Sequence, residues 1–378
     1  MCGATVSTDR GVLIASPAPL RGFVAAVCAA VGAPAEVARE VADHLVEADL
    51  CGHESHGIAR LDQYLAEYDR GELRPAATPE VLRSSGATVL IDAARGFGHF
   101  STATAVDMAV PRAREHGVGA VAVRHSGHIG RLGRYCERVA GSGMIALLTM
   151  GAAGPGVGAM ALPGAGSRFL AANPWATGIP SVGEPVVVDV SMTAVAEGKV
   201  SAAMATGREL PADCLIDEAG RPSTRPEDYF HGGSLLPLGG AVAPHKGFGM
   251  ALAAAMLGGL GMVEDPDPTL GGSQRPASST GRGEIGGVLL VVIDPAHFGE
   301  PGAYRTLVGE AGRHVRTAEA AGGGLTVPGL PERRLHAARQ HGLPLPAHTA
   351  DRLRLIGRRF GIEFDVGDGR PVAATRRG

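Results

Sequence analysis

The sequence has almost no lysine or asparagine. Of its 35 basic residues only Lys199 and Lys246 are lysines, and Asn173 is the single asparagine. Abundant arginine and alanine suggest a GC-rich genome that removes lysine and asparagine from neutral positions, so those that remain are stronger candidates for a chemical role. Cysteine is also scarce. The five cysteines are scattered without a CxxC pair, which argues against a disulfide scaffold or a cysteine zinc site and predicts a reducing cytoplasm.

Long apolar runs and basic blocks are absent as well. No uninterrupted apolar stretch is long enough to cross a bilayer, and Met1–Arg10 lacks the basic and apolar regions of a secretory signal. The net charge of −3 argues against nucleic acid or an anionic membrane as the main partner. The 378 residues are enough for two or three lobes with a large buried core.

Hydrophobic periodicity separates helical ends from a β-rich middle. Helical spacing over residues 18–50 predicts two helices that are separated at Gly32 and Pro34, and a third helix is predicted at Gly57–Arg70. Apolar β-rich runs predict strands at Thr88–Ile91, Val118–Val123, Met144–Thr149, Pro185–Val190 and Val288–Ile293. Further helices are predicted at Ser101–His116, Arg131–Gly141, Thr193–Ala205, Phe248–Met262, Pro331–His341 and His348–Phe360. The polar stretch Gly271–Gly283 is expected to be a loop, and the tail to Gly378 is expected to fray.

Polar residues are concentrated in the segment GHESHGIARLDQY, which spans Gly52–Tyr64. A helix that starts near Ser55 would place His56, Arg60 and Tyr64 one turn apart on one face. An imidazole exchanges protons near neutral pH, and a guanidinium binds a carboxylate through two parallel hydrogen bonds. Tyr64 would add a hydroxyl, and Ser55 would cap the helix or bind substrate. The segment predicts acid–base chemistry on a carboxylate, and the alternative is a solvated helix face.

A second polar segment, RHSGHIGRLGRY, follows the predicted strand Val118–Val123 directly. Its histidines, His125 and His128, are therefore expected at a strand's C-terminal edge, where α/β sheets bind ligands. The pairs His53/His56 and His125/His128 both have H-x-x-H spacing. Neither has the HExxH order or a third ligand, so no metal site is predicted, although a metal-dependent hydrolase stays open as an alternative.

A dinucleotide fingerprint is present only in part. Gly156, Gly158 and Ala161 match GxGxxA, but Pro163 follows at once and would break the helix that this motif must open, so an ordinary Rossmann site is rejected. Asp189 ends a predicted strand, where it could orient a histidine or bind a ribose. Lys246 directly precedes the predicted helix Phe248–Met262, and a lysine beside free helix N–H groups would bind phosphate.

Taken together, these motifs resemble the malate/L-lactate dehydrogenase family of type 2, which includes sulfolactate and ureidoglycolate dehydrogenases and piperideine-2-carboxylate reductase. The resemblance covers most of residues 18–340. The matching stretches are GHESHGIARLDQYLAEYDRGELRP, GVGAVAVRHSGHIGRLGRY, NP, VVVDVSMTAVAEGKV, LPADCLIDEAGRPSTRPED, LLPLGG, HKGFGMAL, VVIDPAHF and VPGLPE. The chain departs from the family at MGAAGPGVGAMALPGAG and at DVSMT, which leaves an unusual substrate or an inactive homologue open.

The resemblance implies site residues. By resemblance the catalytic and substrate-binding groups would include Ser55, His56, Arg60 and His128. The helix spacing adds Tyr64 as a substrate-binding candidate, and the place of Asp189 at a strand end adds this residue as a catalytic one. By resemblance the dinucleotide would contact Asp189, Val190, Ser191, His245, Lys246 and Gly247. The rarity of asparagine adds Asn173, whose amide would contact the carboxamide ring, and the alternative for this residue is an Asx turn. Arg60 would hold the substrate carboxylate, and either His56 or His128 would transfer the proton.

The periodicity predicts an α/β fold, and the resemblance implies a non-Rossmann nicotinamide-binding sheet domain over residues 86–324. Residues 1–85 and 325–378 would form a helical domain for substrate binding and dimerisation. The expected activity is NAD(P)-dependent hydride transfer to or from a small 2-oxo or 2-hydroxy acid in a cytoplasmic homodimer, with NAD and NADP both open. The alternative substrate is a cyclic imino acid with a C=N bond.

Overall fold

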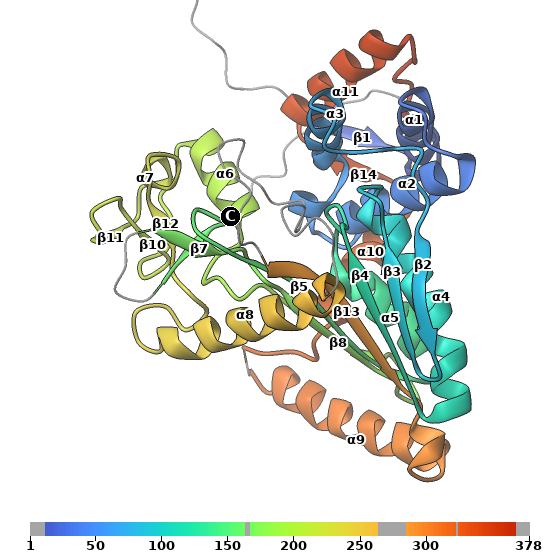
Figure 1. The fold of residues 1–378 in the computed structure, drawn as a ribbon. Coiled ribbons are helices and arrows are strands. Elements are labelled where there is room, and N and C mark those ends of the chain that lie inside the picture. Colours follow the sequence, from blue (N-terminus) through green and yellow to red (C-terminus); the bar gives the residue numbers. More distant parts are fainter. Residues whose placement is uncertain (1–11, 163–166, 264–284, 323, 368–378) are drawn as a thin grey trace, which may run out of the picture. The chain divides into compact units, whose positions relative to one another are not determined.

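The computed structural model describes residues 12–162, 167–263, 285–322 and 324–367 (Figure 1). They form two compact units, one from the residues before Glu72 together with those after Pro331, and the other from Glu72–Pro331. The predicted loop Gly271–Gly283 and the end of the tail lie outside the described residues. Over the described ranges, no helix is long and apolar enough to cross a membrane.

The helical unit is built from both ends of the chain, drawn in blue and red in Figure 1. Its elements are β1 (Leu13–Ala15), α1 (Pro17–Ala30), α2 (Ala35–Leu50), the 3-10 turns η1 (Glu54–His56) and η2 (Ile58–Arg60), α3 (Leu61–Asp69), most of α10 (Leu330–Arg339), β14 (Leu343–Leu345) and α11 (Ala347–Phe360). Strand β1 pairs antiparallel with β14, so the two ends of the chain share one small sheet. Leu20, Val24, Val41 and Leu45, on the apolar faces that the periodicity predicts, are completely buried.

The other unit contains a 12-stranded mixed sheet. Its strands are β2 (Glu80–Ser85), β3 (Thr88–Asp92), β4 (Val118–Arg124), β5 (Ile145–Ala153), β6 (Met160–Ala161), β7 (Arg168–Leu170), β8 (Trp175–Ile179), β9 (Val186–Val190), β10 (Leu215–Ile216), β11 (Pro222–Ser223), β12 (Ser234–Leu235) and β13 (Ile285–Ile293). The order is β11-β10-β12-β6-β7-β5-β13-β4-β3-β2, and β8 pairs with β5 and β9. Because β3 and β4 are parallel, their C-terminal ends meet at the same edge.

Helices cover the centre of this sheet. Helix α4 (Gly98–His116) packs on β4, α5 (Leu132–Gly141) packs on β5 and β8, and α8 (Pro244–Gly258) packs on β5 and β13. Glycine permits the last contact, because a Cβ at Gly151 of β5 would lie 2.4 Å from the Ala255 nitrogen of α8. The remaining helical elements are α6 (Glu197–Thr206), α7 (Pro226–Phe230), η3 (Gly259–Met262), η5 (Pro295–His297) and α9 (Pro301–Ala320).

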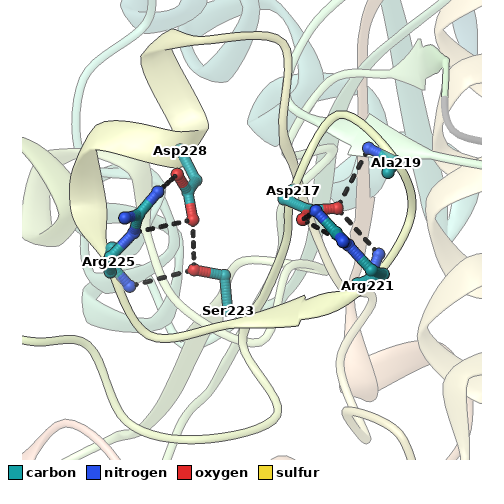
Figure 2. Close-up of polar contacts among 6 residues, drawn as sticks. All are labelled: Asp217, Ala219, Arg221, Ser223, Arg225 and Asp228. Atoms are coloured by element: carbon teal, nitrogen blue, oxygen red, sulfur yellow. Dashed lines mark hydrogen bonds and ion pairs between the residues drawn. The ribbon is translucent and has the colours of Figure 1, made fainter.

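Figure 2 shows how carboxylates stabilise the small hairpin β10–β11 and the helix after it. Asp217 accepts the N–H groups of Ala219 and Arg221, both at 2.9 Å. Asp228 of α7 accepts the Ser223 hydroxyl at 2.5 Å and also binds Arg225. These hydrogen bonds hold the pKa values of both carboxyls below their usual range. The motif residues LPADCLIDEAGRPSTRPED therefore have a structural role in the fold.

The predicted elements are found in most of the described chain, and all five predicted strands are confirmed as β3, β4, β5, β9 and β13. Three predictions need correction. The helix expected from Gly57 begins only at Leu61, α6 begins at Glu197 and not at Thr193, and α8 begins at Pro244 and not at Phe248. The sequence analysis did not predict α9 or the short strands β10–β12. Gly156 and Gly158, both at positive φ, lead into β6 and not into a helix, as the rejection of a Rossmann site requires.

Candidate active site

The polar segment of the helical unit is not one continuous helix. It consists of η1 and η2, which are separated at Gly57, whose φ of −90° and ψ of −158° are extended. The predicted one-turn spacing of His56 and Arg60 on a single α-helix is therefore wrong. His56 ends the first of two adjacent 3-10 turns and Arg60 ends the second, so both residues lie on one short segment.

Ser55, His56 and Arg60 are linked by hydrogen bonds within this segment. The Ser55 Oγ lies 3.0 Å from His56 Nδ1, so the serine does not cap a helix but fixes one face of the imidazole. Arg60 Nε donates to the Ser55 carbonyl at 2.5 Å, and Nη1 donates to Gln63 Oε1 at 2.5 Å. These contacts fix the guanidinium plane and leave its Nη2 edge to bind a carboxylate.

Gln63 and Glu67 extend the network beyond the predicted residues. Gln63 Nε2 donates to Glu67 Oε1 at 2.8 Å, and Glu67 is buried. The amide is thereby oriented with its oxygen toward Arg60. The i, i+3 and i+4 spacing of Arg60, Gln63 and Glu67 was the sequence signal for this network.

Tyr64 lies in the core of the chain and not on an open surface. It is 2 % exposed, and burial raises the pKa of its phenol above its ordinary value. A direct substrate contact would require the ring to leave the core, so the structure does not support the predicted substrate-binding role of Tyr64. Its position one turn after Arg60 places it on the inner face of α3, which explains the burial.

In the sheet unit, His128 lies in a turn that packs tightly against the start of α4. Tyr135 of α5 donates its hydroxyl to the Ile129 carbonyl at 2.7 Å, and a Cβ at Gly98 would lie 2.6 Å from the His128 carbonyl. The imidazole lies edge-to-face with His99, with ring centroids 6.2 Å apart. His128 is half-buried, so one part of the ring remains accessible to a reactant.

The histidine three residues earlier has a different environment. His125 adopts a left-handed backbone (φ +49°), and its Nδ1 lies 3.1 Å from both oxygens of Asp92 at the end of β3. Arg124 Nε donates to the same carboxylate at 2.8 Å, and so does the Ala94 N–H at 2.7 Å. Burial favours a higher pKa for Asp92, but these hydrogen bonds and charges outweigh it and hold the pKa below its usual range.

The paired histidines therefore differ in role, because His125 is bound to Asp92 and His128 is not part of that ion pair. No cluster of three or more His, Cys, Asp and Glu side chains arranged for a metal ion occurs among the residues that the structure describes. Sequence analysis missed Asp92, although an acidic residue at the end of a strand parallel to β4 was a usable signal.

Asp189 at the end of β9 contacts the same part of the sheet unit. Its Oδ2 accepts the N–H of Gly133, in the first turn of α5, at 2.7 Å. A Cβ at Gly133 would lie 3.3 Å from this oxygen, so a small residue is favoured there. Asp189 thus holds the helix that follows the His128 turn, and its role in orienting a histidine or a cofactor stays a prediction. The next residue, Val190, is 38 % exposed, and the Ser191 hydroxyl lies 2.6 Å from that of Thr193.

Asn173 is buried and adopts a left-handed backbone (φ +41°). Its Oδ1 accepts the Ala152 N–H at 2.9 Å, and its Nδ2 donates to the carbonyls of Ala152 at 3.2 Å and Ala251 at 2.8 Å. The single asparagine therefore joins β5 to α8, with both amide protons engaged. The presence of this one asparagine therefore has a structural explanation. The geometry does not itself support the predicted contact with a carboxamide ring.

His245 and Lys246 are exposed in the first turn of α8. The amide of Lys246 donates to the Ala243 carbonyl at 3.2 Å, and the amide of Gly247 donates to the Leu238 carbonyl at 3.2 Å. A Cβ at Gly247 would lie 2.4 Å from Leu238 atoms, so this glycine is required for packing. The expected phosphate cradle of free N–H groups is thus reduced, and the exposed Lys246 ammonium and His245 imidazole remain.

The structure brings Ser55, His56 and Arg60 together in the helical unit. The remaining candidates, His128, Asp189, Val190, Ser191, His245, Lys246 and Gly247, lie in the sheet unit. A half-buried imidazole in each unit and an oriented guanidinium are the groups that proton transfer and carboxylate binding need.

Solved structures that share this architecture include dehydrogenases and a reductase, so the chain has the fold of this class of α/β enzyme. The sulfolactate dehydrogenase of Methanocaldococcus jannaschii matches with a TM-score of 0.79 at 28% identity, covering 93% of this chain and 98% of that chain. The Δ1-piperideine-2-carboxylate reductase of Pseudomonas syringae pvar. tomato matches with a TM-score of 0.76 at 29% identity, covering 91% and 99%.

Sequence comparisons agree. The family model for malate/L-lactate dehydrogenase matches residues 15–354. The M. jannaschii L-sulfolactate dehydrogenase is 30% identical over 335 residues, which are 88% of this chain and 93% of the relative. The Escherichia coli hydroxycarboxylate dehydrogenase B is 32% identical over 291 residues, 75% of this chain and 76% of the relative. The chain belongs to the malate/L-lactate dehydrogenase family, which confirms the resemblance identified from its motifs.

Proposed function

We propose that this protein is an NAD(P)-dependent oxidoreductase that transfers a hydride between a nicotinamide cofactor and C2 of a small 2-oxo or 2-hydroxy acid. The observation that carries the proposal is the segment Ser55–Arg60, in which an imidazole and an oriented guanidinium lie on two adjacent turns. Family membership supplies the reaction class.

The residues of the sheet unit fit a dinucleotide by their chemistry. His245 and Lys246 present exposed cationic or hydrogen-bonding groups at a helix start, which suits a pyrophosphate, and Ser191 offers a hydroxyl to a ribose. These residues, with Asp189 and Val190, would hold the cofactor. When bound, the nicotinamide would supply or accept the hydride.

The protein's own groups would perform the other steps. Arg60 would bind the substrate carboxylate through its Nη2 edge and so fix C2 in one orientation. His56 or His128 would donate a proton to the carbonyl oxygen as hydride arrives at C2, and would take it back in the oxidative direction. Ser55, hydrogen-bonded to His56 Nδ1, would keep that ring's other nitrogen directed outward.

A cyclic imino acid is the second candidate substrate. The specific observation in its favour is the structural match to a piperideine-2-carboxylate reductase. Such a substrate keeps the carboxylate that Arg60 would bind, and the proton would go to nitrogen. We further propose a cytoplasmic homodimer. The cytoplasmic assignment is supported by four buried thiols that form no disulfide, those of Cys28, Cys51, Cys136 and Cys214, and the dimer by the family resemblance.

The test is a reductase screen of 2-oxo acids and cyclic imino acids with NADH and with NADPH. We expect turnover of at least one acid and poor turnover of its ester, because the ester lacks the charge that Arg60 binds. Equal turnover of acid and ester would contradict the carboxylate assignment. Binding of either reduced cofactor without turnover of any substrate would indicate an inactive homologue.

A further inference from the structure

The acidic residue Asp49 contacts the segment that carries His56 and Arg60. It is the second-last residue of α2, and it is only 3 % exposed. Its Oδ2 accepts the Ile58 N–H at 2.8 Å. Ile58 is the first residue of η2, so the carboxyl group holds the main chain between the proposed proton donor and the proposed substrate-binding guanidinium.

The Asp49 carboxyl group also lies very close to the backbone of Gly57, the residue before Ile58. A Cβ at Gly57 would lie 2.1 Å from Asp49 Oδ1 and 2.4 Å from Oδ2, which no side chain could tolerate. The carboxyl group therefore packs directly on the Gly57 backbone, where the chain changes from η1 to η2. The extended conformation of Gly57 and the hydrogen bond to Ile58 together fix the angle between the two turns.

The charged groups that act on Asp49 come from other elements. Glu54 lies in η1, and Arg339 of α10 donates through Nη1 to the main-chain carbonyl of Asp49 at 2.6 Å and to Glu54 Oε1 at 2.9 Å. Burial raises the pKa of Asp49 to about 8, the Ile58 N–H opposes the rise, Glu54 adds to it and Arg339 lowers it. The group is a poor structural choice for a core position, because an apolar residue would avoid the cost of burying a carboxyl.

We propose that Asp49 is a positioning residue for the oxidoreductase site, which sets the orientation of His56 relative to Arg60 by holding Ile58 and Gly57. The inference rests on the proposed function. Asp49 itself touches neither substrate nor cofactor, and it acts through the two turns. Its sequence signal was an acidic residue one turn beyond Leu45 on the otherwise apolar stripe of α2.

The experiment compares Asp49→Leu with Asp49→Asn. Leucine removes the hydrogen-bond acceptor while keeping a branched side chain of similar length in the core, so the variant is expected to fold. Asparagine keeps an oxygen that can accept the Ile58 N–H. Asp43→Asn is the matched control, because Asp43 lies on the same helix but is exposed at 38 % of its side chain and pairs with Arg21.

Two readouts are measured on the full chain. For Asp49→Leu we expect kcat/KM to fall at least tenfold, through both kcat and KM, and deuterium uptake of the peptide over residues 54–60 to become at least tenfold faster. Asp49→Asn should restore both to within about threefold of the wild type, and Asp43→Asn should change neither.

Unchanged deuterium uptake in Asp49→Leu would overturn the proposal, and so would equal impairment of the leucine and asparagine variants. Deuterium uptake needs no substrate or cofactor. A wild-type protein that reduces no acid in the screen would therefore contradict the proposed function, while the uptake measurement would still decide the role of Asp49.

Discussion

In the helical unit the segment with His56 rests on Asp49, whereas in the sheet unit the chain before His128 is held by Asp92. Both carboxyl groups accept a main-chain N–H. Asp92 also binds Arg124 and His125, and its pKa is lowered, whereas Arg339 donates to the main-chain carbonyl of Asp49 and burial raises the pKa of its carboxyl to about 8. A carboxyl group that accepts a main-chain N–H is therefore ionised near pH 7 at Asp92 in the sheet unit, and is expected to be protonated near pH 7 at Asp49 in the helical unit.

The largest expected effect distinguishes the two histidine-bearing segments. His56→Asn and His128→Asn should each lower kcat. The histidine that acts as the general acid should be the one whose replacement lowers kcat by about 10²–10⁴-fold. Steady-state kinetics with the best acid from the screen gives the answer. His314→Asn is the control in the sheet unit, because His314 is exposed on α9. If His56→Asn and His128→Asn both keep the kcat of the wild type, the proposed mechanism is wrong.

The next effect concerns the carboxylate site of the helical unit. Arg60→Lys should raise KM about ten- to a hundredfold, because an ammonium cannot donate to Ser55 and Gln63 as the planar guanidinium does and at the same time present a fixed donor to the carboxylate. Arg352→Lys is the control, since Arg352 forms only an exposed ion pair with Asp62. If Arg60→Lys leaves KM unchanged with the acid substrate, the helical segment does not bind the carboxylate.

The charge states of Asp49 and Asp92 predict opposite pH dependences of stability. The unfolded pKa of both is near 3.8, so the contribution of Asp92 is present above that pH and is lost as the pH falls through its lower folded pKa. Asp92→Asn should therefore lower the free energy of unfolding by about 1.5 kcal/mol between pH 5 and 8, with a smaller penalty near pH 3.

For Asp49 the sign reverses, because its folded pKa of about 8 is raised. The folded state keeps the proton that the unfolded state has released, so stability falls as pH rises from about 4 to about 8. Asp49→Asn removes this dependence, and its Tm relative to the wild type should rise over that range and then level off. Scanning calorimetry of both variants from pH 3 to pH 9 tests the pair, and parallel profiles would refute the contrast.

The smallest effect is expected at α8, where no carboxylate holds the segment. The amides of Lys246 and Gly247 are already engaged, so only the exposed ammonium of Lys246 would reach a phosphate. Lys246→Met should weaken binding of NADH or NADPH, and of ADP-ribose, by about two- to fivefold. Lys199→Met is the matched control in α6. Identical titration curves for Lys246→Met and the wild type would exclude the contact.

The sequence predicted the central strands well because each is a run of β-branched and apolar residues that the sheet buries. It did not predict the break at Gly57, because that conformation depends on Asp49 from the preceding helix and not on local preference. Helix α9 was missed because most of its residues are exposed, although Glu300, which accepts the N–H groups of Gly302 and Ala303, and Pro301 marked its start.

The candidate site residues and their roles stay predictions, and the structure shows the surroundings of each. Motif order identified Ser55, His56, Arg60 and His128, whose exposure and contacts suit chemistry. For Asn173, rarity in the composition has a structural explanation beside the proposed one, because a buried crosslink between β5 and α8 needs an amide as much as a cofactor does. Asp49 and Asp92 were not predicted as positioning residues. Asp92 contacts His125, which is distant in the sequence, and Asp49 contacts Ile58, which lies beyond the turn that follows α2.

The pairing of β13 with β5 has a consequence for the order in which the protein can fold during synthesis. One edge of β5 (Ile145–Ala153) pairs with β7 and β8, which follow it closely in the sequence, but its other edge pairs with β13 (Ile285–Ile293), and β1 pairs with Leu343–Leu345. The ribosome must therefore release nearly the whole chain before the centre of the sheet or the helical unit can close. Until then β5 presents an apolar strand edge, so we expect slow folding and dependence on chaperones while the chain is being made.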